Sequence, residues 1–148
     1  MKGTLAVCAL LAACLGGANG ANAADPATKP APTAARNRLV LQVSDDDVKK
    51  WNTVFNNVRN VQADLGPANV DIEIVVYGPG IGLLKADSLV ANRVEDAMDT
   101  GIRFVACGNT MTAQNLTKDD MIDKIDYAQA GIVRLMQRQQ QGWVYIRP

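Results

Sequence analysis

The chain has 148 residues, with 15 Lys and Arg against 15 Asp and Glu, and it contains no histidine. The balanced charge shows no basic stripe of the kind that binds nucleic acid, so no nucleic-acid partner is expected. The absence of histidine excludes Ser-His-Asp and Cys-His nucleophile pairs, and also zinc sites that use a histidine ligand.

The first 23 residues have the features of a signal peptide. Lys2 supplies a positive start, residues 5–15 are apolar, and Ala21-Asn22-Ala23 fits a signal-peptidase site. The apolar run is shorter than the roughly 20 residues that a membrane-spanning helix needs, so we expect no transmembrane span. These features predict a protein exported to a bacterial periplasm.

A second processing route stays open. Leu11-Ala12-Ala13-Cys14 resembles a bacterial lipobox, in which Cys14 would carry a lipid anchor. Cleavage after Ala23 is favoured, because an A-x-A site is present and the segment before Cys14 is short for a lipoprotein signal. That cleavage would leave Cys107 as a single cysteine, without a disulfide partner or a C-x-x-C motif, and therefore either shielded or reactive.

Residues 24–37 are rich in Pro, Ala and Thr and predict a disordered linker. The folded domain should therefore span residues 38–148, which are enough for one domain with a core but not for two.

The domain should begin with a strand at residues 38–43 and a helix opened by Ser44 and Asp45-Asp46-Asp47. The aspartate run could hold a metal ion, but a charged first turn explains it, and no metal site is expected. Apolar residues then recur every three or four positions up to Gly66-Pro67, and only Gln62 interrupts them.

Residues 70–77 predict a second strand, which ends at Tyr77 and continues into Gly78, Gly80 and Gly82. The G-x-G-x-G spacing matches neither the dinucleotide fingerprint nor the P-loop. The loop is interpreted either as a flexible turn or as a backbone cradle for an anion or small ligand. Residues 83–100, with Leu84 and Leu89 on the apolar stripe, predict a second helix that ends at Gly101.

Residues 102–106 predict a buried third strand that leads directly into Cys107. Gly108 permits a tight exit, and Asn109 or Thr110 can cap a helix that follows. The carboxyl ends of neighbouring parallel strands share one edge of a sheet, where open α/β folds bind ligands. We therefore expect the glycine loop and Cys107 to lie together.

The remaining residues predict a short helix at 110–115, a capping box at Thr117–Asp120 and a last helix at 128–141. In that helix Ile132, Leu135 and Met136 should face the core, whereas Arg134 and Arg138 should face solvent. A strand at residues 143–146 ends the chain. This order predicts a single layered α/β domain with a largely parallel sheet.

Several segments resemble the DsrE/DsrF-like family, and most closely its uncharacterised secreted branch. The likeness runs from about Leu39 to Pro148 and is most specific at Phe104–Met111, Ala130–Leu135 and Gln141-Gly142-Trp143. It implies a flavodoxin-like or YchN-like α/β fold and a homo-oligomer, either a trimer or a hexamer. It also implies sulfur relay, in which a cysteine after a central strand carries a persulfide, and Cys107 matches that position. The relay members are cytoplasmic and work with dedicated partners, whereas this chain carries a signal.

Two main hypotheses follow. In the first, Cys107 is a sulfur carrier that takes sulfur from a donor and passes it to an acceptor, which can be a protein or a small sulfur compound. Tyr77, Gly78, Gly80, Gly82, Gly108, Asn109 and Thr110 would then shape a ligand pocket beside it, without a cofactor. In the second, the protein is a binding or scaffold module without turnover, and Cys107 is a small core residue. A weaker third hypothesis is an enzyme that uses Asp119 or Asp120.

Overall fold

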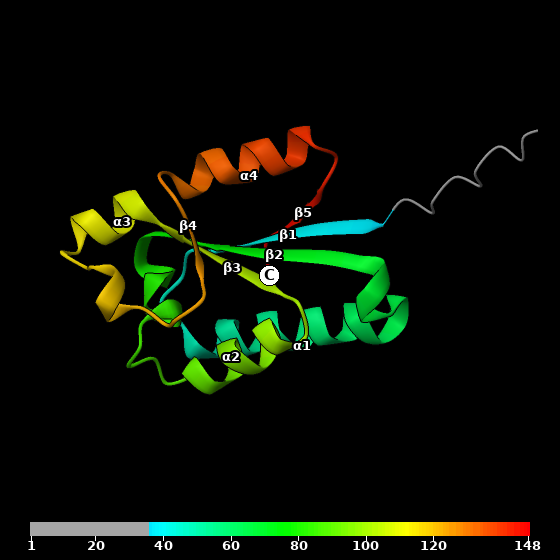
Figure 1. Ribbon diagram of the computed structural model, residues 1–148, viewed down its shortest axis with the longest axis horizontal. Coiled ribbons are helices and arrows are strands. Elements are labelled where there is room, and N and C mark those ends of the chain that lie inside the picture. The colour runs from blue at the N-terminus through cyan, green and yellow to red at the C-terminus, as the bar shows by residue number, and fades with distance from the viewer. Residues whose placement is uncertain (1–35) are drawn as a thin grey trace, which may run out of the picture. The chain divides into compact units, whose positions relative to one another are not determined.

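Residues 36–148, which the computed structural model describes, form a five-stranded sheet in which every strand pair is parallel (Figure 1). The strand order is β4-β3-β2-β1-β5. The strands are β1 (Asn37–Val43), β2 (Val70–Val76), β3 (Arg103–Cys107), β4 (Asp126–Ala128) and β5 (Val144–Ile146). The predicted signal peptide, the lipobox and most of the predicted linker lie outside the described residues, and β1 begins at Asn37, the last residue of that linker.

Helices cover the two faces of the sheet unequally. Helices α1 (Val48–Leu65) and α2 (Ala91–Asp99) lie on one face, and α4 (Gly131–Gln140) lies on the other (Figure 1). Side chains alternate between these layers along each strand, as strand geometry requires. Ile72, Ile74 and Val76 of β2 join the larger core under α1 and α2, whereas Val75 joins a smaller core with Leu135 of α4. The layered parallel α/β fold predicted from the sequence is confirmed.

The first helix forms much as predicted because its ends have clear signals. The Asp47 carboxylate caps it by accepting hydrogen bonds from the amides of Lys49, at 2.8 Å, and Lys50, at 3.3 Å. Gly66 ends it with φ +82°, a conformation that favours glycine. Gln62, the polar residue within the apolar stripe, donates a hydrogen bond to the carbonyl of Thr100 at 3.0 Å.

The helix predicted at residues 83–100 is wrong over its first half. Gly78–Leu84 form a 3-10 helix, α2 begins only at Ala91, and Leu89 is 85 % exposed. The cause is a long-range contact that local periodicity does not reveal. The backbone of residues 84–86 bonds to residues 120–122: Ile122 donates to Leu84 and Ala86 donates to Asp120, each at 2.9 Å. These bonds hold residues 84–86 against residues 120–122 and keep them out of α2.

The region after β3 also differs from the prediction. Helix α3 spans Gly108–Ala113, and the predicted capping box is present around a 3-10 helix at Lys118–Asp120. Residues 126–128 form the edge strand β4, which was not predicted, and the last helix, predicted from residue 128, starts at Gly131. A three-residue strand with mostly exposed side chains is too short to show alternation. Tyr127, in the middle of β4, is 37 % exposed.

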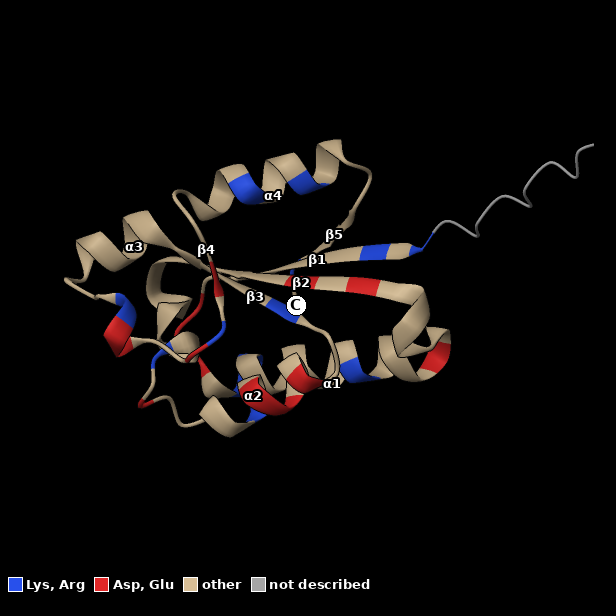
Figure 2. Ribbon diagram, viewed as in Figure 1, with Lys and Arg blue, Asp and Glu red and all other residues tan. Residues whose placement is uncertain are grey.

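Charged residues occur on most of the helices, strands and loops of the domain (Figure 2), and among residues 36–148 only Glu73 is a buried charged residue. Acidic residues occur on β2, and basic residues occur on β3 and α4 beside it. Within residues 36–148, no helix is both long enough and apolar enough to cross a membrane.

Candidate functional site

Cys107 lies where β3 ends and α3 begins. It is the last residue of β3 and the N-cap of α3, between neighbouring strands β2 and β4. Its side chain is 5 % exposed. The helix was predicted to be capped by Asn109 or Thr110, but no side chain caps it, because the helix begins at Gly108, before either residue.

The Cys107 sulfur has polar backbone groups beside it. The backbone amide of Gly131 donates a hydrogen bond to Sγ at 3.2 Å, and the Gln129 carbonyl lies 3.9 Å from Sγ. Burial raises the pKa of the thiol, but the Thr110 hydroxyl and the amides of Gly131, Thr110 and Asn109 lower it by more, so the net pKa is below the usual value. These donors favour the thiolate, which is the nucleophilic form.

Gly131 can donate to the thiol because it has no side chain. A Cβ at this position would lie 3.1 Å from Cδ1 of Tyr77, 3.2 Å from its Cβ and 3.3 Å from Cγ1 of Val75. Each distance is shorter than ordinary van der Waals contact. Glycine therefore allows the first turn of α4 to approach β2 and brings its free amide to the sulfur.

Gly78, the first residue of the glycine loop, contacts the residues that follow Cys107. The amide of Gly78 donates to Oγ1 of Thr110 at 2.9 Å, and Nε2 of Gln114 donates to the Gly78 carbonyl at 3.4 Å. Burial raises the pKa of Tyr77, and the nearby Tyr145 and Cys107 raise it further, against a lowering by Arg147. The structure thus brings Tyr77 and Gly78 next to Cys107 and Thr110.

Gly80 and Gly82 lie elsewhere. A Cβ on Gly80 would meet the carbonyl oxygen of Val43 at 2.9 Å, so this glycine permits close backbone packing between β1 and the loop. Gly82 lies against the Trp51 ring, and it lines a separate depression with Asp46 and Pro79.

The other predicted site residues contact the segment that joins β4 to α4. The backbone amide of Asn109 donates to the backbone carbonyl of Gln129 at 3.0 Å, and its side-chain Oδ1 accepts from Nε2 of Gln129 at 2.6 Å. Gly108 lies opposite Ala128 and Gln129, and it lines a depression of about 430 Å³ together with Tyr127. Ala128 and Gln129 thus lie against Gly108 and Asn109, the two residues that follow Cys107.

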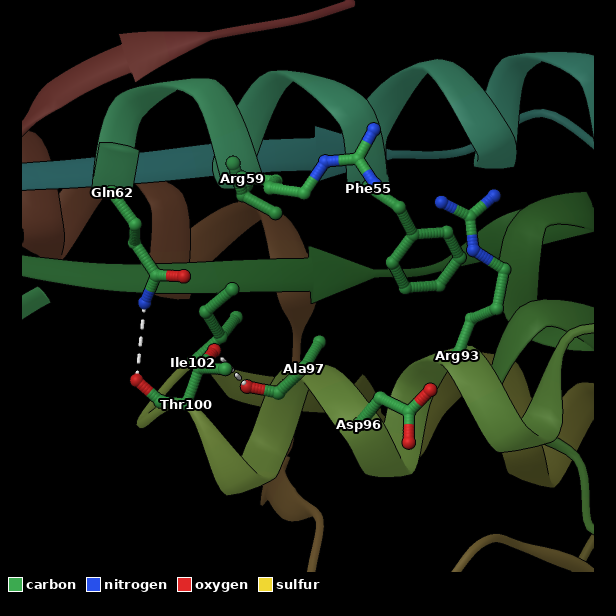
Figure 3. Close-up of a pocket in the computed structure, with 9 residues that line it drawn as sticks. Phe55, Arg59, Gln62, Arg93, Asp96, Ala97, Thr100 and Ile102 are labelled. Carbon is green, nitrogen blue, oxygen red and sulfur yellow. Dashed lines mark hydrogen bonds between the residues drawn. The ribbon is translucent and has the colours of Figure 1, made fainter. Parts of the chain in front are cut away.

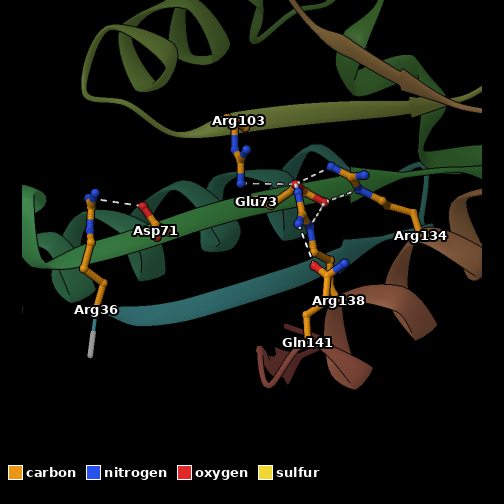
Figure 4. Close-up of polar contacts among 7 residues, drawn as sticks. All are labelled: Arg36, Asp71, Glu73, Arg103, Arg134, Arg138 and Gln141. Atoms are coloured by element: carbon orange, nitrogen blue, oxygen red, sulfur yellow. Dashed lines mark hydrogen bonds and ion pairs between the residues drawn. The ribbon is translucent and has the colours of Figure 1, made fainter. Parts of the chain in front are cut away.

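Sequence reasoning missed a buried ion cluster on the α4 side of the sheet (Figure 4). Glu73 of β2 is fully buried, and its carboxylate pairs with Arg134 at 2.7 Å, Arg138 at 2.5 Å and Arg103 at 3.4 Å. Burial raises the pKa of Glu73, but hydrogen bonds and charge from Arg134 and Arg138 outweigh it and lower the pKa. Arg138 and Arg103 also stack on the Trp143 ring, at 4.5 and 5.6 Å.

This cluster corrects the predicted orientation of α4. Arg134 and Arg138 face the sheet, whereas Ile132 and Met136 are 55 % and 52 % exposed; of the predicted core residues only Leu135 is buried. The periodicity predicted the wrong face of α4 because it considers apolar residues only. The buried carboxylate of Glu73 attracts two arginines to the face of α4 that packs on the sheet. One charged residue inside an apolar strand is the signal that could have indicated it. Gly131, placed inside a predicted helix, was a second unused signal.

Among residues 36–148 there is no group of three or more Cys, Asp or Glu side chains arranged to hold a metal ion. The donors around Sγ of Cys107 support the chemistry of a thiolate at this position.

Comparison with known proteins gives the family of the chain. Residues 38–148 match the model of the DsrE/DsrF-like family. MTH1491 from Methanobacterium thermoautotrophicum, a protein of unknown function, is 37 % identical, with a TM-score of 0.73 over 76 % of this chain and 99 % of that one.

Two further solved structures share the fold. BT1422 from Bacteroides thetaiotaomicron, another protein of unknown function, is 15 % identical with a TM-score of 0.63 over 76 % of this chain and 95 % of that one. YchN from E. coli is 8 % identical with a TM-score of 0.62 over 76 % of this chain and 99 % of that one. No curated protein matches the chain. The family match and the 37 % identity to MTH1491 establish that this chain belongs to the DsrE/DsrF-like family.

Proposed function

We propose that the protein is a sulfur carrier that holds sulfur as a persulfide on Cys107. One observation supports this above all: the Gly131 amide donates to Sγ at 3.2 Å, at the start of the ten-residue helix α4. The free amides and the dipole of a helix N-terminus stabilise a negative charge. Together with Thr110 they lower the pKa of the thiol without any histidine.

The transfer needs no external oxidant when the donor is a sulfane sulfur compound such as thiosulfate. The Cys107 thiolate attacks the outer sulfur, an S–S bond forms, and the original S–S bond breaks to release sulfite with its electron pair. The product, the Cys107 persulfide anion, carries one negative charge, as the thiolate did. A thiolate acceptor then attacks the terminal sulfur and regenerates the Cys107 thiolate.

A second candidate function is a binding or scaffold module without turnover. The observation in its favour is the 5 % exposure of Cys107, which is low for a residue that must meet a donor. In this reading the Gly131–Cys107 hydrogen bond locks α4 against β3, and the protein acts through its surfaces.

Both functions are compatible with a homo-oligomer in an exported location, which we also propose. Ile132, Val133 and Met136 lie together on the outer side of α4 and are each about half exposed, at 55 %, 46 % and 52 %. A second copy of the chain covering this surface would remove it from water. The signal-like first 23 residues support export, and mass spectrometry of the processed N-terminus would distinguish cleavage after Ala23 from acylation of Cys14.

The deciding experiment measures sulfur uptake by intact mass. The protein is incubated with thiosulfate or polysulfide, and we expect an adduct of one sulfur atom that a reducing thiol removes. A Cys107→Ser variant should show no adduct. Native alkylation with iodoacetamide is measured in parallel. If Cys107 neither alkylates nor takes up sulfur while the protein stays folded, the carrier proposal is wrong and the binding module is supported.

A further inference from the structure

A groove between α1 and α2 forms a cavity of about 200 Å³ (Figure 3). Ile102, which lines it, precedes β3, so the cavity lies at the opposite end of that strand from Cys107. We call it the α1–α2 groove. Its floor is apolar and consists of Phe55 and Val58 of α1 and Ile102, which precedes β3. These three side chains are between 2 % and 4 % exposed, so they belong to the core and are held in place.

Two arginines reach this floor from the two helices. Arg93 of α2 lies over the Phe55 ring, 4.7 Å from its centre, and bonds to Oδ1 of Asn52 and, at 3.4 Å, to Oδ1 of Asn56. Arg59 of α1 donates to the same Asn56 oxygen at 3.3 Å. The shared acceptor brings the two guanidinium groups close together, and Figure 3 shows the Phe55 ring directed toward α2 between these helices.

Of the six other arginines among residues 36–148, five contact acidic groups, and the sixth, Arg38, does not line the groove. Arg36, Arg103, Arg134, Arg138 and Arg147 each pair with a carboxylate, but within residues 36–148 neither Arg59 nor Arg93 forms an ion pair. Two neighbouring positive charges repel each other, and the repulsion is stronger beside an apolar floor, where water screens the charges less. An anion bound between the two guanidinium groups would relieve this repulsion. The planar fork of each guanidinium suits a carboxylate oxygen pair.

We propose that the α1–α2 groove binds a small organic monocarboxylate, with its carboxylate on Arg59 and Arg93 and its apolar body on Phe55, Val58 and Ile102. The cavity is smaller than the ~300–1,000 Å³ of typical drug-sized sites, which limits the ligand to a compact body such as one aromatic ring or a short branched chain. Asp96 also lines the groove, and its negative charge disfavours anions that carry two or more charges. The site is separate from the thiol and does not depend on the sulfur-carrier proposal.

The test uses the full folded protein and phenylacetate as probe, with binding measured by calorimetry and by amide NMR shifts. We expect saturable binding with shifts centred on residues 55–59 and 93–102. The neutral isostere phenylacetamide should bind at least about tenfold more weakly, because it lacks the charge that the arginines recognise. Phenyl phosphate, which carries a second charge, should also bind more weakly.

Variants identify the groove as the site. Arg59→Gln should weaken phenylacetate binding about tenfold, whereas Arg36→Gln, an exposed arginine elsewhere that pairs with Asp71, should leave it unchanged. Arg93→Gln should weaken it further, and thermal unfolding shows whether that variant stays folded. Arg59 bonds only to exposed Asn56, so its variant remains interpretable if Arg93→Gln unfolds. Equal binding of the acid and the amide, no saturation at millimolar phenylacetate, or an unchanged affinity in Arg59→Gln would each overturn the proposal.

Discussion

The amide of Gly131 donates to Sγ of Cys107 across 3.2 Å, although the two residues are 24 positions apart in the chain. This hydrogen bond joins the start of α4 to the end of β3. The protonation of the thiol therefore depends on how α4 packs on the sheet.

Thr110 provides a direct test of the lowered thiol pKa. In Thr110→Val the hydroxyl donor to Sγ is lost, so the pKa of Cys107 should rise and its thiolate fraction at pH 7 should fall. We expect alkylation at pH 7 to slow about fivefold, which corresponds to one hydrogen bond of about 1 kcal/mol. Thr110→Ser keeps the hydroxyl and should behave like the wild type. Identical pH profiles for Thr110→Val and the wild type would contradict this account of the thiol.

Gly131→Ala should disturb both packing and the thiol. The new methyl group would lie 3.1 Å from Tyr77, so Tyr77 or the start of α4 must shift, and we expect the free energy of unfolding to fall by about 1–3 kcal/mol. A shift of α4 moves the amide donor, so the alkylation midpoint should move to higher pH. Gly108→Ala is the matched control, because its Cβ would meet nothing closer than 3.5 Å and should cost little. A stable Gly131→Ala protein with an unchanged midpoint would show that the glycine is dispensable.

Glu73 should stabilise the fold in a pH-dependent way. Its folded pKa lies below its ordinary value of 4.5, so its stabilisation is present above pH 4.5 and is lost as the pH falls through the folded pKa. At pH 7, Glu73→Gln should lower the free energy of unfolding by about 3–5 kcal/mol, because it leaves Arg134 and Arg138 half-buried without their partner.

In acid the difference between wild type and Glu73→Gln should shrink, because below pH 4.5 the unfolded wild-type carboxyl takes up a proton that the folded one resists, and the folded state loses part of its advantage. Denaturant unfolding of both proteins at pH 7 and pH 3 measures this difference. Asp71→Asn, in the same strand but half-exposed, should change stability by less than about 1 kcal/mol at either pH. A Glu73→Gln difference that stays constant with pH would argue against the ion cluster as its source.

Gly80 distinguishes packing from ligand binding in the glycine loop. Gly80→Ala places a methyl group 2.9 Å from the Val43 carbonyl oxygen, a backbone atom that cannot rotate away, and should destabilise the protein by about 1–3 kcal/mol. Gly82→Ala comes no closer than 3.4 Å to the Trp51 ring and should cost less. Equal melting temperatures for Gly80→Ala and the wild type would remove the packing explanation.

The outer surface of α4 should control assembly. Placing lysines at Ile132 and Met136 should lower the mass measured by light scattering to that of a single chain, because charges within a buried apolar contact are not tolerated. Gln137→Lys adds a charge to an exposed position of the same helix and should leave the mass unchanged. An unchanged mass in the double variant would place any subunit contact elsewhere.

Local patterns in the sequence were enough to predict the layered parallel α/β fold, the first helix with its ends, and the position of Cys107 at the end of an inner strand. These features depend on periodicity, on capping residues and on glycine, which act over a few positions of the chain. The family likeness, carried by residues around Cys107 and near the C-terminus, predicted the same fold, and the family match confirms it.

Only the tertiary structure decided which partners these residues have. The path of residues 84–86 depends on backbone bonds to residues 120–122, and β4 exists because β3 offers it an edge. Arg134 and Arg138 turn inward because Glu73 is buried opposite them. The amide that faces the thiol comes from Gly131, which no local pattern connects to Cys107. Such contacts join segments far apart in sequence, and their energies outweigh the local helix and strand preferences on which a prediction from sequence depends.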